Sequence, residues 1–456
     1  MFAASIYSAR REVLAQRLGS GLVLLLGNRD SAYNYVDNIY PFRQDSTFLY
    51  YVGLDLPNLA VVMDLDSGKT TLYGDEPDID ALVWTGPLPA MGERAAGSGI
   101  AYTAHFGRLW TDLKGRQAHF LKPYRGETRL DLEALLGFPA AQVHEHASAV
   151  LTQAVVVQRG VKAPEEIEEI ESALVTTHDI HVLSMREARV GVLEQDVVGK
   201  MQGLALSRGY QMAYGVIFSS RGEILHNHDH SVRLRGGELM VNDSGVESLK
   251  GYATDITRTF VVGGRFNGLQ ASMYDLVLKA QEAAIAALKP GIPYRDIHWL
   301  ACRVMVQGMI DMGFYRGDAQ SAVDAGAHAL FFQCGTGHMM GLDVHDMEGL
   351  GENLVGYGES YERSKLFGHK SLRLARPVRE GWVVTVEPGV YINPWLLDQW
   401  KAENRHSEFI NYAEFEKLRG LGGIRIEDDV LVTGTGSRVL GPYIPKLRSE
   451  VEALAR

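Results

Sequence analysis

Acidic side chains interrupt apolar, strand-like runs at three places in the chain, and this pattern restricts the fold more than any other feature. In ELMVNDSGVESLKGYATDITRTF (238–260), one apolar run leads to Asp243 and the returning run carries Asp255. The two aspartates lie twelve residues apart across a glycine-flanked turn, so a hairpin would place them side by side. Buried carboxylates are costly unless a cation or hydrogen bonds compensate. A metal ion is the simplest explanation of the pair, although Asp243 alone also fits an ordinary turn aspartate.

A second pair of acidic residues occurs late in the chain. Glu387 follows the apolar run of WVVTVEPGVY (382–391), and Glu427 follows that of GGIRIEDDVLV (422–432). A glutamate among valines is difficult to explain as a solvent-facing residue, because charged side chains are rarely buried without a partner. The sequence therefore predicts carboxylates at the ends of several strands.

Histidines stand between the two acidic pairs. CGTGHMMGLDVHD (334–346) holds His338 and His345, which are seven residues apart. A histidine in a glycine-flanked loop suits a metal ligand, but the loop alone leaves a structural histidine open as an alternative. Four carboxylates with one imidazole form an oxygen-rich set, which favours ions such as Mn(II) over thiolate-bound zinc. Their negative charges would balance two divalent cations, and such a pair can activate a water molecule.

The composition indicates a globular chain of ordinary hydrophobicity. It has 456 residues, with 45 Lys and Arg against 56 Asp and Glu, a formal net charge of −11. This balance argues against nucleic acid or an acidic membrane surface as the main partner, because both require basic patches. The two cysteines, Cys302 and Cys334, cannot form a disulfide framework, and no apolar run is long enough for a membrane helix. These features predict a cytoplasmic protein without a membrane partner.

The first part of the chain alternates short apolar runs with helical stretches, which is typical of an α/β domain. We predict its strands at 22–26, 48–53, 59–64 and 69–73, and its helices at 75–81 and from Asp131 onward. A linker at 158–164 ends at Pro164, where the proline and the glutamates that follow predict a helix start. The chain thus divides into a domain at 1–158 and a larger domain at 164–456.

Helices alternate with strands in the larger domain. We predict helices at 166–188, 194–208, 268–288 and 294–312, and strands at 238–247, 252–262, 382–392 and 424–433. The polar and aromatic segment 393–421 shows no strand alternation, so we expect a helical insertion there. The fold class that these elements predict is α+β.

Several of these stretches resemble a known family. NDSG…ATDITRTF, GTGHMMGLDVHD, TVEPGVY and GGIRIEDD resemble the motifs of the Xaa-Pro metallopeptidases, the aminopeptidase P and prolidase family, and FRQDSTFLYYVGL (42–54) is similar to a strand and turn of the family's N-terminal domain. The resemblance spreads over residues 5–445 and keeps all five ligand types in the family order. It implies a pita-bread catalytic domain preceded by a smaller α/β domain of the aminopeptidase P N-terminal type. It also implies a peptidase that cleaves between an N-terminal residue and a following proline.

The resemblance assigns the metal ligands position by position. Asp243 resembles the chelating ligand of one metal, Asp255 and Glu427 resemble the bridging carboxylates, and His338 and Glu387 resemble the remaining ligands of the second metal. The implied cofactor is a pair of divalent ions, of which Mn(II) is favoured and Co(II) and Zn(II) are alternatives.

The resemblance also assigns catalytic and substrate-binding residues. His345 stands where the family has a histidine near the scissile carbonyl, and His226, in GEILHNH, stands where it has one that contacts the substrate. Arg425 matches the arginine of the family's G-[IV]-R-I-E pattern, and Tyr391 follows the E-P-G turn as in relatives. We predict that Glu387 additionally shuttles a proton.

The choice between dipeptides and longer peptides depends on the group that follows proline. A dipeptide ends there in a carboxylate, and Arg373, in SLRLAR, falls where prolidases place an arginine for it. Together with the long segment between Glu387 and Glu427, this favours the dipeptidase, prolidase, over an aminopeptidase P that acts on longer peptides. Bacterial aminopeptidases P share the long segment, however, so the second reading stays open.

Two positions depart from the family pattern. The spacing between Asp243 and Asp255 is one residue longer than usual, and we place the extra residue in the 246–251 turn. Cys334 stands where many relatives have a histidine, which could weaken a substrate contact, add sensitivity to oxidation, or only change the packing of the loop.

Other functions compete with the peptidase. A catalytically inactive pita-bread binding protein or a creatinase-like hydrolase would lack ligand residues, whereas all five positions are filled here. A methionine aminopeptidase would lack the large N-terminal domain. Relatives form dimers or tetramers, so the resemblance implies a homodimer or homotetramer, in which the aromatic cluster of Tyr33, Tyr35, Tyr40 and Phe42 could serve an interface or equally fill the N-terminal core.

Overall fold

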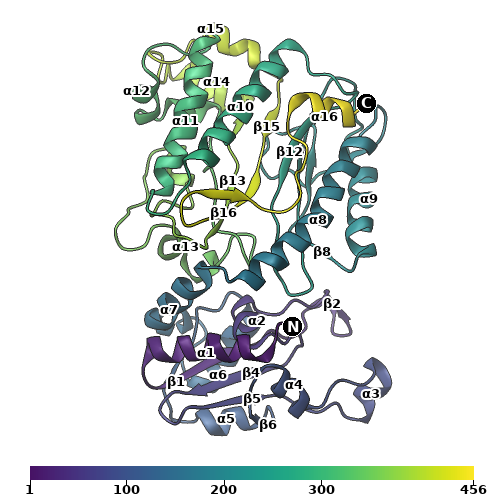
Figure 1. Cartoon of the computed structure of the whole chain (residues 1–456), viewed down its shortest axis with the longest axis vertical. Helices are drawn as coiled ribbons and strands as arrows, with labels where there is room; N and C mark the ends of the chain where they lie inside the picture. The colour runs from purple at the N-terminus through teal and green to yellow at the C-terminus, as the bar shows by residue number, and fades with distance from the viewer. The chain divides into compact units, whose positions relative to one another are not determined.

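One five-stranded sheet organises the N-terminal unit, Met1–Arg159, in the computed structural model, which describes residues 1–456. Its elements are α1 (Ala4–Leu18), β1 (Leu22–Leu26), β2 (Ala32–Tyr35), β3 (Asn38–Ile39), α2 (Ser46–Val52), β4 (Ala60–Asp64), β5 (Lys69–Tyr73), α3 (Ile79–Thr85), α4 (Met91–Gly97), β6 (Tyr102–Ala104), α5 (Arg108–Leu113), β7 (Ala118–His119), α6 (Gly126–Leu136), η1 (Val143–His146) and α7 (Ala149–Gly160). The strand order is β6-β5-β4-β1-β7, with β4 antiparallel and β7 parallel to β1 (Figure 1). The apolar run of β1, an inner strand between β4 and β7, is buried, as its sequence predicts.

The strand predicted at 48–53 is wrong, because these residues belong to the helix α2. The Asp45 side chain caps this helix by accepting a hydrogen bond of 2.8 Å from the Phe48 N–H, and Gly53 ends it in a left-handed conformation. Every residue of α2 is buried, so its sequence lacks the polar face that reveals an amphipathic helix. The helix predicted at 75–81 begins only at Ile79, after an Asp78 cap.

A short break separates α7 from the first helix of the C-terminal unit, Gly160–Arg456. That helix, α8 (Pro164–Glu187), begins at the predicted proline, and the Ala163 N–H donates to Glu166 Oε2 at 2.9 Å. The predicted linker is shorter than expected, because α7 extends to Gly160.

The C-terminal unit consists of small sheets covered by long helices. After α8 its elements are α9 (Glu194–Ser207), β8 (Gln211–Met212), β9 (Ile217–Ser219), β10 (Leu239–Asp243), β11 (Val246–Glu247), β12 (Thr257–Val261), α10 (Gly268–Ala287), α11 (Tyr294–Asp311), α12 (Ala319–Asp324), η2 (Ala327–Leu330), α13 (Glu348–Gly356), η3 (His369–Ser371), β13 (Val383–Val386), β14 (Gly389–Tyr391), α14 (Pro394–Ala402), α15 (Tyr412–Phe415), η4 (Glu416–Leu418), β15 (Gly423–Arg425), β16 (Asp428–Val432), β17 (Ser437–Val439) and α16 (Arg448–Leu454). The predicted helical insertion at 393–421 is confirmed by α14, α15 and η4. No helix combines the length and apolarity that a bilayer crossing requires.

Backbone pairing brings the acidic hairpins together. β10 and β12 form an antiparallel pair in which Asp243 lies opposite Thr257. β13 pairs with β16, and β14 pairs with β15. An isolated bridge between Thr257 and Glu427 joins the first hairpin to the last, and another between Met339 and Val384 attaches the histidine loop to β13. Backbone pairing therefore joins the segments that carry Asp243, His338 and Glu427.

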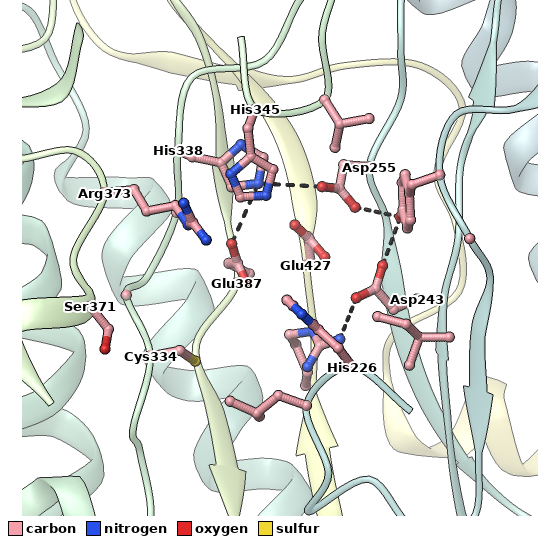
Figure 2. Close-up of a pocket in the computed structure, with 18 of the residues that line it drawn as sticks. His226, Asp243, Asp255, Cys334, His338, His345, Ser371, Arg373, Glu387 and Glu427 are labelled. Carbon is pink, nitrogen blue, oxygen red and sulfur yellow. Dashed lines mark hydrogen bonds and ion pairs between the residues drawn. The ribbon is translucent and has the colours of Figure 1, made fainter. Parts of the chain in front are cut away.

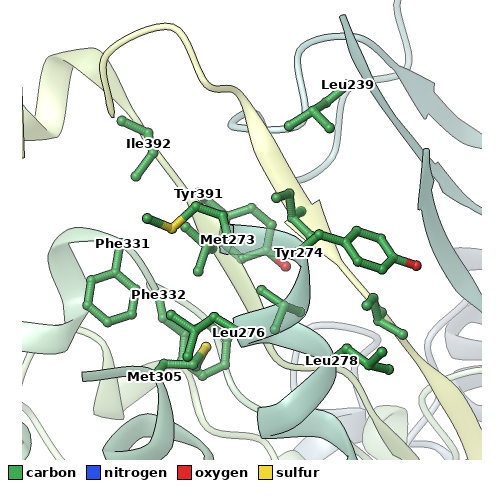
Figure 3. Close-up of a cluster of buried hydrophobic side chains, with 14 of the residues drawn as sticks. Leu239, Met273, Tyr274, Leu276, Leu278, Met305, Phe331, Phe332, Tyr391 and Ile392 are labelled. Carbon is green, nitrogen blue, oxygen red and sulfur yellow. The ribbon is translucent and has the colours of Figure 1, made fainter. Parts of the chain in front are cut away.

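A large apolar core fixes these sheets against the helices. It includes Met273 of α10, Met305 of α11 and Phe331, which follows η2 (Figure 3). α10 and α11 pack side by side (Figure 1). Burial of such large side chains contributes on the order of 2 kcal/mol each, so the strands that carry the acidic residues rest on a rigid support.

Candidate metal centre

The predicted metal ligands line one cavity of about 580 Å³ in the C-terminal unit (Figure 2). They are Asp243, Asp255, His338, Glu387 and Glu427. Ligand atoms of Asp255, His338 and Glu427 all lie within 4.8 Å of one another, and all three side chains are buried. The structure therefore gathers in one place residues that the sequence distributes over several hairpins.

Tyr214 links the two aspartates of the first hairpin. Its hydroxyl lies 2.7 Å from Asp243 Oδ1 and 2.5 Å from Asp255 Oδ1. A phenol has one proton, so it can donate to only one of these oxygens at a time. Arg425 donates from Nη2 to the other oxygen of Asp243. These contacts hold both carboxylates toward the cavity.

Thr257 positions Glu427 on the opposite hairpin. Its hydroxyl donates to Glu427 Oε2 at 2.6 Å and accepts from Arg425 Nε at 3.0 Å. The backbone N–H of Asp255 donates to Asp429 Oδ2 at 3.1 Å, which ties the two hairpins together a second time. Hydrogen bonds thus fix Asp243, Asp255 and Glu427 at the wall of the cavity.

The orientation of His338 suits a metal ligand. Its Nδ1 lies 3.0 Å from the carbonyl of Met339, which can only accept, so Nδ1 carries a proton. Nε2 then faces Asp255 Oδ2 at 3.3 Å and Glu387 Oε1 at 3.7 Å. A nitrogen lone pair directed at two carboxylate oxygens is favourable only with a proton or a cation between them.

Gly337 allows this loop to approach β13 closely. A Cβ atom at this position would lie 2.1 Å from the carbonyl oxygen of Thr385 and 2.3 Å from the Tyr294 hydroxyl. The Glu387 N–H also donates to the carbonyl of Thr336 at 2.8 Å. The glycine that the sequence places before His338 is therefore required by the close contact of two backbones.

The clustered acidic side chains of the centre favour the binding of a proton or a cation. Burial raises the pKa of Glu387 to about 7, and burial together with Asp255 and Glu387 raises the pKa of Glu427 well above its usual range. Burial alone would lower the pKa of His338, but Asp255 and Glu387 raise it to about 9. Divalent cations would neutralise these carboxylates, and oxygen donors with one imidazole match ions of the Mn(II) type. The residues therefore fit the predicted metals.

Metal affinity should increase as the pH rises through about 7. A cation binds the deprotonated form of Glu387, whose pKa is raised from 4.5 to about 7, so protons compete with the metal below that pH. We expect the affinity for Mn(II), measured by calorimetric titration of the chelator-treated protein, to fall by at least about tenfold per pH unit between about pH 7 and about pH 5, because the raised pKa values of His338 and Glu427 add further competing protons. In Glu387→Gln this dependence should become shallower. The same slope in both proteins would contradict the prediction.

His345 and Arg373 share an acidic partner that the sequence did not reveal. Glu348 lies 3.2 Å from His345 Nδ1 and accepts from Arg373 Nη1 at 2.7 Å. His345 also stacks on the ring of His338, with centroids 3.8 Å apart. Burial and the positive charge of His338 lower the pKa of His345, while Glu348 opposes this effect. Glu348 thus positions both residues on one wall of the cavity.

The remaining predicted substrate contacts occupy different depths. His226 and Arg425 line the cavity, whereas Tyr391 is buried behind it, where its hydroxyl accepts from Arg425 Nη1 at 3.0 Å.

Cys334 lines the cavity with its sulfur 4.0 Å from the Tyr391 hydroxyl. Burial raises the pKa of the Cys334 thiol to about 12, so it stays protonated and weakly reactive.

The 246–251 turn, in which we predict the extra residue, is short. Val246 and Glu247 form β11, and the Gly251 N–H closes the turn by donating to the Ser248 carbonyl at 2.9 Å. Gly245 lies so close to the backbone of Thr254 that a Cβ atom would be 1.8 Å from its carbonyl oxygen. The longer loop therefore leaves Asp243 and Asp255 beside each other.

Tyr214, Thr257 and Glu348 were missed by sequence reasoning. Tyr214 precedes the short strand β9, and nothing in its neighbourhood distinguishes it from a core tyrosine. Glu348 begins a helix, a position where glutamate is common in any protein. Of the three, only Thr257 could have been inferred from the sequence, because it lies two residues after Asp255 in the same motif.

Comparisons with known proteins agree with this geometry. Residues 168–434 match the model of metallopeptidase family M24, and residues 7–119 match that of the aminopeptidase P N-terminal domain. The Xaa-Pro dipeptidase of Homo sapiens is 29% identical over 468 residues, which cover 98% of this chain and 93% of the relative. The Xaa-Pro aminopeptidase of Escherichia coli K12 is 30% identical over 469 residues, which cover 98% and 97%. The structure of E. coli aminopeptidase P with the inhibitor Pro-Leu matches with a TM-score of 0.82 at 28% identity, covering 100% of this chain and 98% of that one.

Fold and site together define a metallopeptidase. Because the family model spans more than half of the sequence, the chain belongs to metallopeptidase family M24. The predicted resemblance and the predicted α+β fold, with a pita-bread catalytic domain after a smaller N-terminal domain, are confirmed. The names of the relatives include both dipeptidases and aminopeptidases, so they support the peptidase without selecting one of the two.

Proposed function

We propose that this protein is a dinuclear metal-dependent peptidase that hydrolyses the bond between an N-terminal residue and a following proline, with Xaa-Pro dipeptides as its preferred substrates. The observation that carries the proposal is the convergence of the five predicted ligands on one cavity. Membership of family M24 supports the same reading. The metals that we propose are two Mn(II) ions, because the donors are mainly carboxylate oxygens.

The peptide bond before proline lacks an N–H, so an enzyme that acts on it must recognise other groups. When bound, the metal ions would polarise the scissile carbonyl and lower the pKa of a water molecule. Glu387 can accept and return a proton beside its proposed role as a ligand, because its carboxylate faces the cavity in which the substrate would lie. The His345 N–H can donate to the developing oxyanion, and Glu348, 3.2 Å from His345 Nδ1, holds the ring in place.

The ends of the substrate would be selected by charge. The free amine of the first residue would lie among the acidic side chains, which restricts cleavage to the N-terminus. Arg373 would bind the carboxylate of a dipeptide, since only Nη1 is engaged by Glu348 and the side chain points into the cavity (Figure 2). An arginine fork can bind a carboxylate with two parallel hydrogen bonds. This arrangement favours Xaa-Pro over longer peptides.

Comparison of Ala-Pro with Ala-Pro-Ala, after reconstitution with Mn(II), tests the proposal. We expect a higher kcat/KM for Ala-Pro, and a loss of about 10- to 100-fold for this substrate in Arg373→Ala, because a charge-assisted hydrogen bond contributes about 1.5–3 kcal/mol. Cleavage of Ala-Pro-Ala should change little. Arg379→Ala, which removes an exposed arginine nearby, is the matched control. Efficient release of alanine from the tripeptide by the wild-type protein would refute the preference for dipeptides.

The second candidate is an aminopeptidase P that acts on longer peptides. The match with E. coli aminopeptidase P over nearly the whole of both chains favours this reading. The same pair of substrates separates the two functions.

A homodimer or homotetramer is proposed with either function, and its size can be measured by light scattering.

A further inference from the structure

Two histidines and a cysteine form a second cluster of ligand atoms in the C-terminal unit. His298 and Cys302 lie one turn apart on α11, and His328 belongs to η2. Their ligand atoms all lie within 4.8 Å of one another, and all three residues are fully buried. None of the three lines the cavity of the carboxylate centre. The cluster is therefore a separate feature of the fold.

His328 has no hydrogen-bond partner for either ring nitrogen. Both Nδ1 and Nε2 are buried, and neither is bonded to another group. Other buried histidines of this unit are satisfied, for example His181, whose Nε2 lies 3.0 Å from the Ser244 carbonyl. Buried polar groups are nearly always paired, so a ring with two unpaired nitrogens points to a missing ligand.

The orientation of His298 supports the same conclusion. Its Nδ1 lies 2.8 Å from Thr336 Oγ1, and its Nε2 lies 3.6 Å from the sulfur of Cys302. Burial lowers the pKa of His298 to about 3, and burial also lowers the pKa of His328 well below its usual range. Both rings are therefore neutral at physiological pH, and each offers a lone pair.

The surroundings limit the charge that the cluster can accept. The ring of Phe332 lies 5.6 Å from that of His298, and Met305 and Phe331 belong to the same apolar core (Figure 3). His369 lies beside the cluster, with its ring 4.6 Å from that of His328, and its Nε2 lies 3.1 Å from the carbonyl of Val323. Burial raises the pKa of the Cys302 thiol well above its usual range, so Cys302 becomes a thiolate only when a cation displaces its proton. That one thiolate can balance only a single positive charge. A divalent ion would leave a buried net charge, which is unfavourable.

We propose that His298, Cys302 and His328 form a buried binding site for one Cu(I) ion. Thiolate and imidazole ligands suit this soft ion, and three of them with one negative charge give a neutral complex. Zn(II) fits less well, because it prefers four ligands and would keep a positive charge. Binding forms a Cu–S bond and breaks the S–H bond of Cys302, whose proton leaves to the solvent. Copper keeps its oxidation state throughout.

The experiment is a titration of the Mn(II)-loaded full-length protein with Cu(I), under anaerobic reducing conditions, against the chromophoric chelator bicinchoninate. We expect one equivalent of Cu(I) to bind, and the affinity to fall at least about 100-fold in Cys302→Ser and in His328→Gln, since even outer partners of a metal site contribute 10- to 100-fold. Cys334→Ser, which removes the other cysteine, is the matched control and should bind as the wild-type protein does.

X-ray absorption of the wild-type complex makes the test independent of whether the variants fold. We expect scattering from one sulfur and two imidazole nitrogens. Absence of sulfur in the copper shell, failure to bind one equivalent, or equal loss of affinity in Cys334→Ser would each overturn the proposal. Stronger binding of Zn(II) than of Cu(I) at Cys302 would overturn the identity of the ion.

Discussion

Replacement of Glu387 by glutamine should lower kcat by about 10²- to 10⁴-fold, the range expected when a general acid–base residue is removed. The amide retains an oxygen for the metal but cannot accept a proton. The measurement is kcat for Ala-Pro at saturating Mn(II), together with the metal content of each preparation.

Glu403→Gln is the matched control, because it makes the same change at an exposed glutamate of the C-terminal unit. It should retain the activity of the wild-type protein. The stated role of Glu387 would be refuted by near-normal turnover of Glu387→Gln with a full complement of metal. A variant that loses both metal and activity would instead assign Glu387 to metal binding alone.

Replacement of His345 by alanine should reduce kcat by about 10²- to 10³-fold, as expected when a donor to an oxyanion is removed. The ring stacks on His338 and approaches Glu348, so it is held in place before the substrate arrives. KM should change much less than kcat, because the oxyanion develops only in the transition state.

Glu348→Gln tests the partner of His345. It weakens the contact that holds the ring in place but leaves the ring itself, so we expect a smaller loss of about 10- to 100-fold. A higher KM with unchanged kcat in His345→Ala would contradict the oxyanion role.

The sequence was most informative about the site where a charged residue interrupts an apolar run. Asp243 and Glu427 stand within apolar runs, and only a buried polar centre reconciles a charged residue with such a run. The same local reasoning located β1 and the start of α8 correctly, because an apolar strand and a proline-led helix are visible within a few residues.

Other features depend on contacts that no local pattern contains. α2 is buried along its whole length, so its apolar residues resemble a strand. Tyr214 reaches the centre because β9 pairs with β10, and Glu348 meets Arg373 across 25 residues of chain. These neighbours are determined by the tertiary fold, which explains why the predicted ligands converge while several residues that support them were not foreseen.

The bridge between Thr257 and Glu427 has a consequence for the biosynthesis of this protein. Glu427, between β15 and β16, follows the other four proposed ligands in the chain. During synthesis the N-terminal unit and most of the C-terminal unit would therefore leave the ribosome before the proposed ligand set is complete. With these ligands, ion loading would follow the emergence of the last hairpin.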